Sequence, residues 1–112
     1  MKLILMNSAM MPQTGTYKCR YITEEEFRQI YKNCKASGGT IESLIGYPET
    51  AYHVSQLVGE RIFMSRNETV LENKDIMLVC KLPYRPKDPN NKDQIKPTEY
   101  SYAIVEYEEN NE

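Results

Sequence analysis

Two short runs of consecutive apolar residues stand out along the chain. Residues 3–6 read Leu-Ile-Leu-Met, and residues 76–82 read Ile-Met-Leu-Val-Cys-Lys-Leu. A short, continuous apolar run is typical of a β-strand that is covered on both faces of its sheet. These two segments are therefore predicted to be the central strands.

Three further segments are predicted to flank this centre. Residues 17–22 and 100–107 are rich in aromatic and β-branched residues with partial alternation, and residues 61–64 form a weaker, shorter strand candidate. The turn-forming residues 11–15, Met-Pro-Gln-Thr-Gly, place two strand candidates too close in sequence for a crossover connection. We therefore expect a mixed sheet.

A first helix is predicted after Thr23, which forms a capping box with Glu26, while Ile22 and Phe27 are placed as a hydrophobic staple. The Ser-Gly-Gly sequence at residues 37–39 ends this helix. Its predicted buried stripe has the spacing i, i+3, i+4, i+7 and consists of Phe27, Ile30, Tyr31 and Cys34.

A second helix is predicted from Pro48, with Glu49 in its first turn and Gly59 as its stop. Its apolar residues are Ala51, Val54, Leu57 and Val58. The N-cap position falls on Tyr47, which has no short side-chain acceptor for the free backbone amides. We expect that something other than capping holds Tyr47 there.

Strands interleaved with helices predict an α/β fold with a mixed, roughly five-stranded sheet flanked by helices. A length of 112 residues fits one domain spanning residues 1–112. Residues 85–99 are rich in Pro, Asn and charge without periodicity, which indicates a lid-like loop. The acidic tail of residues 106–112 is expected to fray, above all over residues 108–112.

Charge and targeting signals narrow the function classes. A formal net charge of −2 gives no general attraction to nucleic acid, so duplex DNA is not an expected partner. The opening apolar run is too short for a signal peptide or a membrane span. We therefore expect no membrane partner and a cytoplasmic location, which is the host cytoplasm if the protein is viral.

The residues that commonly hold metals are sparse. Three widely spaced cysteines, Cys19, Cys34 and Cys80, lack a Cys-x-x-Cys pair and are expected to be reduced and buried. The sole histidine, His53, lies about 110° from the centre of the second helix's apolar stripe and is interpreted as a solvated flank residue. No metal site and no cofactor are predicted.

The remaining candidate chemistry gathers at the ends of the predicted elements. Asn7-Ser8 follows the first strand, Tyr47 begins a helix, and Tyr84-Arg85 follows a central strand. Ligands of α/β folds bind at strand ends, and helix N-termini attract anions. The 85–99 loop carries Lys87, Lys92 and Lys96. If these lysines fold over this edge, they make a cationic pocket for a phosphorylated ligand. The alternative is that they only keep an exposed loop soluble.

The same residues carry a resemblance to a known family. Leu-Met-Asn-Ser-Ala at residues 5–9, Ser-Leu-Ile-Gly-Tyr-Pro-Glu-Thr-Ala at 43–51, Ser-Gln-Leu-Val-Gly at 55–59, Asn67 and Tyr84-Arg85 occur in the family's order. The chain resembles the viral ring nucleases of type III anti-CRISPR, a family of small dimeric proteins from archaeal viruses, phages and mobile elements.

The resemblance implies a fold, a partner and a reaction. The expected fold is a mixed five-stranded sheet with flanking helices, in a homodimer whose interface cleft holds cyclic tetra-adenylate. The implied reaction is metal-independent: a ribose 2′-hydroxyl attacks the neighbouring phosphate, and the enzyme aligns it, stabilises charge and protonates the leaving 5′-oxygen. Apart from the resemblance, no apolar stripe outside the predicted core requires a dimer.

Carried over by position, Arg85 matches the arginine that contacts the reacting phosphate, and Asp88 lies near where active members place a glutamate. Met10 or Ser8 lies near a serine of the first loop. The ligand-binding positions implied in this way are Asn7, Ser8, Ala9, Met10, Ile45, Gly46, Tyr84 and Lys87, beside the catalytic candidates Tyr47, Arg85 and Asp88.

Tyr47 is the main departure from the family. Active members carry a histidine there as general acid, whereas a phenol has a pKa near 10 and gives up its proton poorly. His53 does not simply replace it, because six helical positions put it about 9 Å further along the axis and about 120° around. Binding is therefore expected to outlast catalysis, and Tyr47 could stack on a base.

Four functional hypotheses follow from these residues. The preferred one is a homodimer that captures a cyclic oligonucleotide signal of an antiviral system, as a sink or as a slow ring nuclease in counter-defence. The second is a fully active ring nuclease that uses Tyr47 and Arg85. The third is a protein–protein interaction module of a mobile element. The fourth, an operator-binding regulator, is disfavoured by the charge balance and the lack of a helix-turn-helix.

Overall fold

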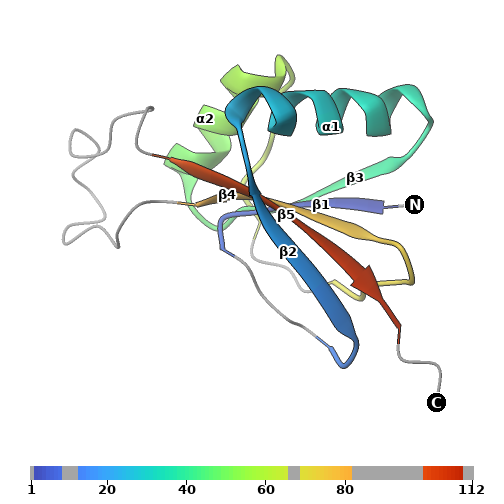
Figure 1. The fold of residues 1–112 in the computed structure, drawn as a ribbon. Helices are drawn as coiled ribbons and strands as arrows, with labels where there is room; N and C mark the ends of the chain where they lie inside the picture. Colours follow the sequence, from blue (N-terminus) through green and yellow to red (C-terminus); the bar gives the residue numbers. More distant parts are fainter. Residues whose placement is uncertain (1, 9–12, 66–68, 82–99, 110–112) are drawn as a thin grey trace.

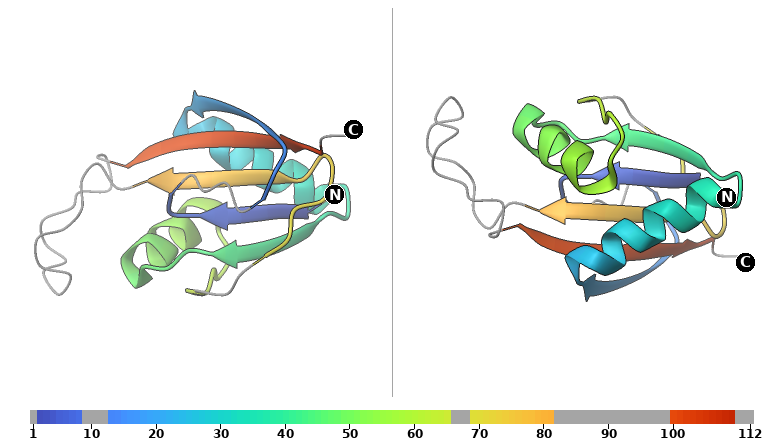
Figure 2. Two further views of the ribbon diagram at one scale, coloured as in Figure 1. Left: turned by 90° about the horizontal axis from the view of Figure 1, so that it is seen from below. Right: turned by 90° about the horizontal axis from the view of Figure 1, so that it is seen from above.

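The computed structural model describes residues 2–8, 13–65, 69–81 and 100–109. A five-stranded sheet lies at its centre in the order β2-β5-β4-β1-β3, and both helices pack on one face of this sheet (Figures 1 and 2). The strands are β1 (Lys2–Met6), β2 (Thr16–Ile22), β3 (Thr40–Leu44), β4 (Ile76–Lys81) and β5 (Ser101–Glu108), and the helices are α1 (Glu24–Ala36) and α2 (Pro48–Val58). The α/β class and the mixed five-stranded sheet are confirmed, although the helices cover one face rather than both.

Strands β1 and β4 are adjacent in the interior of the sheet, as predicted. They pair in parallel with Leu5 opposite Leu78, and β1 also pairs in parallel with β3. Successive residues of β1 enter opposite cores: Leu3 and Leu5 face the helices, whereas Ile4 and Met6 belong to a second cluster on the other face. A continuous apolar run is what such a doubly covered strand requires.

The connection between β1 and β2 differs from the prediction. Strand β2 pairs only with β5, and β5 runs antiparallel to both β2 and β4. Strands β1 and β2 are therefore parallel and three strand positions apart, so the chain crosses over between them instead of turning back. A connection of nine residues reaches about 30 Å, which is longer than three strand spacings of about 5 Å each. The sheet is mixed because β5 is antiparallel to both of its neighbours, whereas the other strand pairs are parallel.

The fifth strand is also not the predicted one. Residues 61–64 form no strand, and β3 takes the edge position instead. The segment after α2 is held beside β3 by two bonds: the Ser43 hydroxyl donates to the Phe63 carbonyl oxygen at 2.7 Å, and the Ser65 N–H donates to the Ile45 carbonyl oxygen at 2.9 Å. Strand β3 is only half-buried, with Glu42 and Ser43 in its middle, so its sequence lacks a strong apolar signal.

Both helices begin and end as predicted. The Glu26 N–H donates to the Thr23 hydroxyl and the Thr23 N–H donates to the Glu26 carboxylate, each at 3.1 Å, which completes the capping box of α1. Helix α2 begins at Pro48 and is terminated by Gly59 at its C-cap. Gly59 has a left-handed φ of 75°, which glycine adopts readily because it has no Cβ. The predicted buried residues of both helices form the core against the sheet: Phe27, Tyr31, Cys34, Ala51, Val54, Leu57 and Val58, with Ile30 partly buried.

Two irregular segments, around Gln13 and Leu71, cover the face of the sheet away from the helices, and hydrogen bonds hold them in place. The Gln13 side chain donates to the Leu71 carbonyl oxygen at 2.8 Å and accepts from the Leu71 N–H at 2.7 Å. The Tyr107 hydroxyl accepts from Gln13 at 2.9 Å and donates to the Thr14 carbonyl oxygen at 2.7 Å. These bonds fix Leu71, which is 2% exposed, over the sheet.

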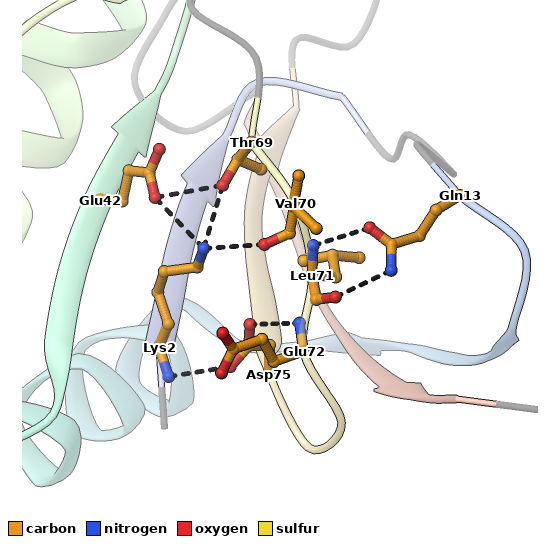
Figure 3. A network of polar contacts seen from close by, with 8 residues as sticks. All are labelled: Lys2, Gln13, Glu42, Thr69, Val70, Leu71, Glu72 and Asp75. Carbon is orange, nitrogen blue, oxygen red and sulfur yellow. Dashed lines mark hydrogen bonds and ion pairs between the residues drawn. The ribbon is translucent and has the colours of Figure 1, made fainter. Parts of the chain in front are cut away.

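The start of β1 is held by a second polar network (Figure 3). The buried Asp75 carboxylate accepts from the Lys2 N–H at 3.0 Å and from the Glu72 N–H at 2.8 Å. The Lys2 ammonium donates to the Val70 carbonyl oxygen at 2.9 Å and lies 3.6 Å from the Glu42 carboxylate. This network ties β1, β3 and the segment before β4 together at the end opposite the predicted site.

Two smaller expectations need correction. Cys34 and Cys80 are buried as predicted, and burial raises the pKa of Cys80 to about 12, but Cys19 is exposed on the edge strand β2. Strand β5 runs through Glu108, and the Glu109 N–H donates to the Asn73 side chain at 3.1 Å, so the acidic tail is not frayed from residue 106 onward. Residues 110–112 lie outside the described part of the chain.

Gly15→Ala is expected to lower the free energy of unfolding by about 1–3 kcal/mol. A Cβ on Gly15 would overlap the buried Tyr107 ring and crowd the Glu108 carbonyl oxygen, which would force the ring out of its place. Urea denaturation measures the loss. The neighbouring exposed variant Thr14→Ala is the control and should stay within about 0.5 kcal/mol of wild type. Equal stabilities for the two variants would contradict this packing.

Candidate functional site

The candidate site lies where the parallel strands end. Strands β1, β3 and β4 run in the same direction, so their carboxyl ends meet at one edge of the sheet, and β5 begins at that same edge (Figure 2). Asn7 and Ser8 follow β1 directly, and residues 45–47 follow β3 and lead into α2. In α/β folds such an edge gathers the polar groups that are not used by the sheet.

Two of the predicted site residues are in direct contact. The Asn7 side-chain oxygen accepts a hydrogen bond from the Gly46 N–H at 2.9 Å. This bond ties the turn after β3 to the end of β1 and so fixes the entry into α2. Ile45 is fully buried in the helix-side core, and its backbone is occupied: its N–H donates to the Ser43 hydroxyl at 3.4 Å and its carbonyl oxygen accepts from the Ser65 N–H at 2.9 Å. Ser8 lies beside Asn7 and is half-buried.

Tyr47 occupies the N-cap of α2 without acting as a cap. Its backbone is extended, with φ −117° and ψ 129°, and its side chain makes no capping bond. Pro48 follows as the first helical residue and carries no N–H. The positive end of the helix dipole therefore faces this edge without a capping side chain, next to a half-buried phenol. The predicted absence of a Tyr47 cap is confirmed.

Thr50 lies in the first turn of α2 and is buried without a partner. It is 0% exposed, and its hydroxyl makes no hydrogen bond with the described residues. The Tyr100 phenol lies close enough for the Thr50 hydroxyl to offset part of the rise that burial causes in the pKa of Tyr100. Tyr100 therefore reaches from the start of β5 to the first turn of α2.

His53 is not the solvated flank residue that the sequence suggested. Its ring stacks on Tyr100 with centroids 4.2 Å apart and planes 9° apart, and its Nε2 lies 2.7 Å from the Tyr102 hydroxyl. The side chains of Tyr100 and Tyr102, at the start of β5, pack against this flank of α2, so His53 faces protein rather than solvent. Burial lowers the pKa of His53, and the charge of Glu24 opposes this shift.

The other predicted site residues lie outside the described part of the chain. These are Ala9, Met10, Tyr84, Arg85, Lys87 and Asp88, together with the rest of the 85–99 loop. The expected cationic pocket and lid therefore stay predictions. The described residues add Thr50 and Tyr100 to this edge, which sequence reasoning missed. In the sequence, Thr50 is only part of the 43–51 motif and Tyr100 the start of a predicted strand, so no local signal connects the two residues.

Over the described ranges, no three His, Cys, Asp or Glu side chains gather in a way that could hold a metal ion. In the same part of the chain, no helix is both long and apolar enough to cross a membrane.

The fold and this edge define a small two-layer α/β protein whose second helix begins at the carboxyl ends of parallel strands. A family model described as STIV B116-like matches residues 3–105. The chain therefore belongs to the STIV B116-like family, which is the viral ring nuclease family that the sequence resembles.

A solved structure shares the fold. B116 of Sulfolobus turreted icosahedral virus matches with a TM-score of 0.70 and 21% sequence identity, over 93% of this chain and 97% of that chain. The comparison with curated proteins returned no match.

Acid is expected to destabilise the protein through His53. Because burial places its folded-state pKa below the ordinary value of 6.5, the unfolded chain binds the proton more readily. The stabilising contribution of the neutral ring is then complete above pH 6.5 and is lost as the pH falls through the folded-state pKa. An NMR titration of this single histidine should give a midpoint below 6.5.

The matched variant His53→Phe keeps an aromatic ring against Tyr100 but does not titrate. Its urea stability should lose the part of the pH dependence that wild type shows in this window. A midpoint at or above 6.5 for wild type would contradict the buried, neutral ring.

Proposed function

We propose that this protein binds a cyclic oligonucleotide second messenger of an antiviral defence system, and that it removes the signal mainly by sequestration or slow cleavage. Cyclic tetra-adenylate is the messenger that the family implies. The observation that carries the proposal is Tyr47: in a family of viral ring nucleases, it stands at the uncapped N-terminus of α2, where active members carry a histidine.

Binding is supported by the geometry of the edge. The uncapped helix end favours a phosphate through its dipole and its backbone amides. The Asn7 to Gly46 hydrogen bond holds the preceding turn rigid, so these groups are already in place before a ligand arrives. By position in the family, Arg85 supplies the cation that contacts the phosphate and Asp88 lies near it, with the rest of the ligand contacts coming from residues 7–10, 45–46, Tyr84 and Lys87.

Slow turnover follows from the missing imidazole. When the 2′-hydroxyl attacks the phosphate, a cyclic phosphate forms and the 5′-oxygen leaves with the bonding electrons, so it needs a proton. A phenol is a poor donor at neutral pH. The one imidazole of the chain belongs to His53, which is stacked on Tyr100 and bonded to Tyr102, and whose pKa is lowered by burial. His53 is therefore committed to the packing of α2 on β5.

The proposed ligand cleft lies at the interface between two copies of the chain. A surface beside α2 is suited to form the contact between the two copies. Tyr52, Phe63 and Met64 are exposed by 68%, 62% and 49% around a hollow of about 590 Å³. Pro48, the neighbour of Tyr47, also lines this hollow. The surface holds both a depression and protruding apolar side chains, so two copies related by a twofold axis could fill each other's hollows.

The nucleotide proposal is tested with Tyr47→His. Restoring an imidazole is expected to raise the cleavage rate of cyclic tetra-adenylate by about a hundredfold, while its dissociation constant changes little. Mass spectrometry of the products measures cleavage and calorimetry measures binding. Tyr47→Phe removes only the hydroxyl and should leave both binding and the slow wild-type cleavage unchanged.

Other outcomes separate the alternatives. If wild type cleaves as fast as Tyr47→His and Tyr47→Phe abolishes the activity, the protein is a fully active ring nuclease that uses Tyr47 and Arg85. If wild type binds no cyclic di-, tri-, tetra- or hexanucleotide, the nucleotide proposal fails and a protein–protein interaction module becomes the better reading of the apolar surface beside α2.

The dimer is tested with Phe63→Glu. A charge in the middle of the apolar surface is expected to convert a dimer into monomers, since burying an unpaired carboxylate is strongly unfavourable. Light scattering coupled to size exclusion measures the mass. Tyr21→Glu, at an aromatic residue of β2 that is 76% exposed, is the control and should leave the dimer intact. A monomeric wild type would remove the dimer from the proposal.

A further inference from the structure

The two edges of the sheet differ in how they are covered. The strand order places β2 at one edge and β3 at the other (Figure 2). The segment after α2 lies against the β3 side, where the Ser65 N–H donates to the Ile45 carbonyl oxygen. In the part of the chain that the structure describes, β2 pairs only with β5. The outer backbone groups of such an edge strand can pair with another extended chain, and the proposed function does not use this edge.

The middle of β2 presents exposed side chains to both faces of the sheet. Tyr17 packs into the core on the face away from the helices. Strand alternation therefore places Cys19 and Tyr21 on that same face. Lys18 and Arg20 lie on the helix side with side chains 66% and 60% exposed, and Tyr21 is 76% exposed. The edge thus offers two cations on one face and a thiol and a phenol ring on the other.

The cations of β2 are flanked by acids on their inner side. Lys18 lies directly opposite Glu106 of β5, and its ammonium is 3.7 Å from the Glu108 carboxylate. The Arg20 guanidinium lies 3.5 Å from the Glu26 carboxylate of α1, and its five N–H donors leave room for a further acceptor. Residues opposite each other on paired strands have Cβ atoms about 5 Å apart. Carboxylates on a strand added outside β2 would therefore continue the alternation of basic and acidic side chains.

A second copy of β2 is a poor occupant of this edge. When a twofold axis normal to the sheet relates two antiparallel strands, side chains that face each other come from the same side of the sheet. A pair centred on Cys19 then sets Lys18 against Arg20. A pair centred on Lys18 or on Arg20 sets that cation against its own copy. Like charges directly opposite each other are destabilising, so the edge favours a chain of opposite charge.

We propose that the outer edge of β2 binds an extended acidic segment of another protein, which joins the sheet as an additional strand. Its carboxylates, at alternate positions, lie opposite Lys18 and Arg20 on the helix side. The apolar side chains between them cover Cys19 and Tyr21 on the other face. Backbone hydrogen bonds to β2 supply the general attraction, and the alternation of acidic and apolar residues selects the partner.

The probe is a fluorescently labelled peptide of ten residues that alternates glutamate and valine, and its anisotropy is followed as the full chain is added. We expect saturable binding that weakens as the salt concentration rises. A twin peptide with lysine in place of glutamate should bind at least about tenfold more weakly. A second twin, N-methylated on its central residues, lacks the backbone donors for a strand ladder and should not bind.

Two exposed substitutions test the charge pairing. Lys18→Gln and Arg20→Gln should each weaken binding of the glutamate peptide about threefold to fivefold, because each removes one cross-strand charge pair. Lys32→Gln, at an exposed lysine on α1, is the matched control and should bind like wild type. These three side chains are exposed, so the variants are expected to fold, and urea denaturation checks this. In NMR spectra of wild type, the amide shifts caused by the peptide should centre on residues 16–22.

Several results would overturn the proposal: no saturable binding of the glutamate peptide, equal binding of the lysine peptide, full binding of the N-methylated peptide, or undiminished binding in both Lys18→Gln and Arg20→Gln. Loss of a wild-type dimer in Tyr21→Glu would assign the edge to a second copy instead. Cyclic tetra-adenylate plays no part in the peptide measurements. Failure of the peptide site therefore leaves the proposed function standing, and failure of nucleotide binding leaves the peptide site standing.

Discussion

The structure depends on burying the two faces of β1 and β4 at once. Leu3, Ile4 and Leu5 are all 0% exposed, so consecutive side chains of one strand need apolar partners on opposite sides of the sheet. The helices supply one side. The other side is supplied by irregular segments, which Gln13 and Tyr107 pin down by hydrogen bonds rather than by helical packing. Without both covers, the central strands would expose a large apolar area to water.

The same constraint places the candidate site. Parallel pairing of β3, β1 and β4 brings three carboxyl ends to one edge, and α2 must begin at that edge to cover the helix-side core. The helix end that results is left without a capping side chain, and a hydrogen bond from Gly46 to Asn7 secures it from the outside. The proposed function places its chemistry at the polar positions that the core leaves at this edge.

Tyrosine and histidine have separate tasks at this edge. His53 links α2 to β5 through Tyr100 and Tyr102, and its burial disfavours the protonated form that general acid catalysis needs. Tyr47 keeps the outward position at the helix start. Under the proposed function, this arrangement favours binding of a cyclic nucleotide over its rapid cleavage.

The sequence by itself determined the features that depend on neighbours along the chain. The capping box of Thr23 and Glu26, the stop at Gly59 and the continuous apolar runs of β1 and β4 involve short-range geometry or burial on both faces, which leave a clear pattern. It also showed that Tyr47 lacks a cap. Asn7 and Tyr47 were predicted to lie at one edge of the sheet, and the structure places both there.

Only the tertiary structure decided which distant segments meet. The strand order, the edge position of β3, the parallel course of β1 and β2, and the packing of His53 against Tyr100 and Tyr102 all depend on contacts between segments far apart in sequence. An edge strand needs only one paired side and a half-buried face, so Glu42 and Ser43 fit it without an apolar pattern. The helical or strand repeat of a sequence predicts the direction in which a side chain points. What it meets there is set by the free energy of packing the whole chain.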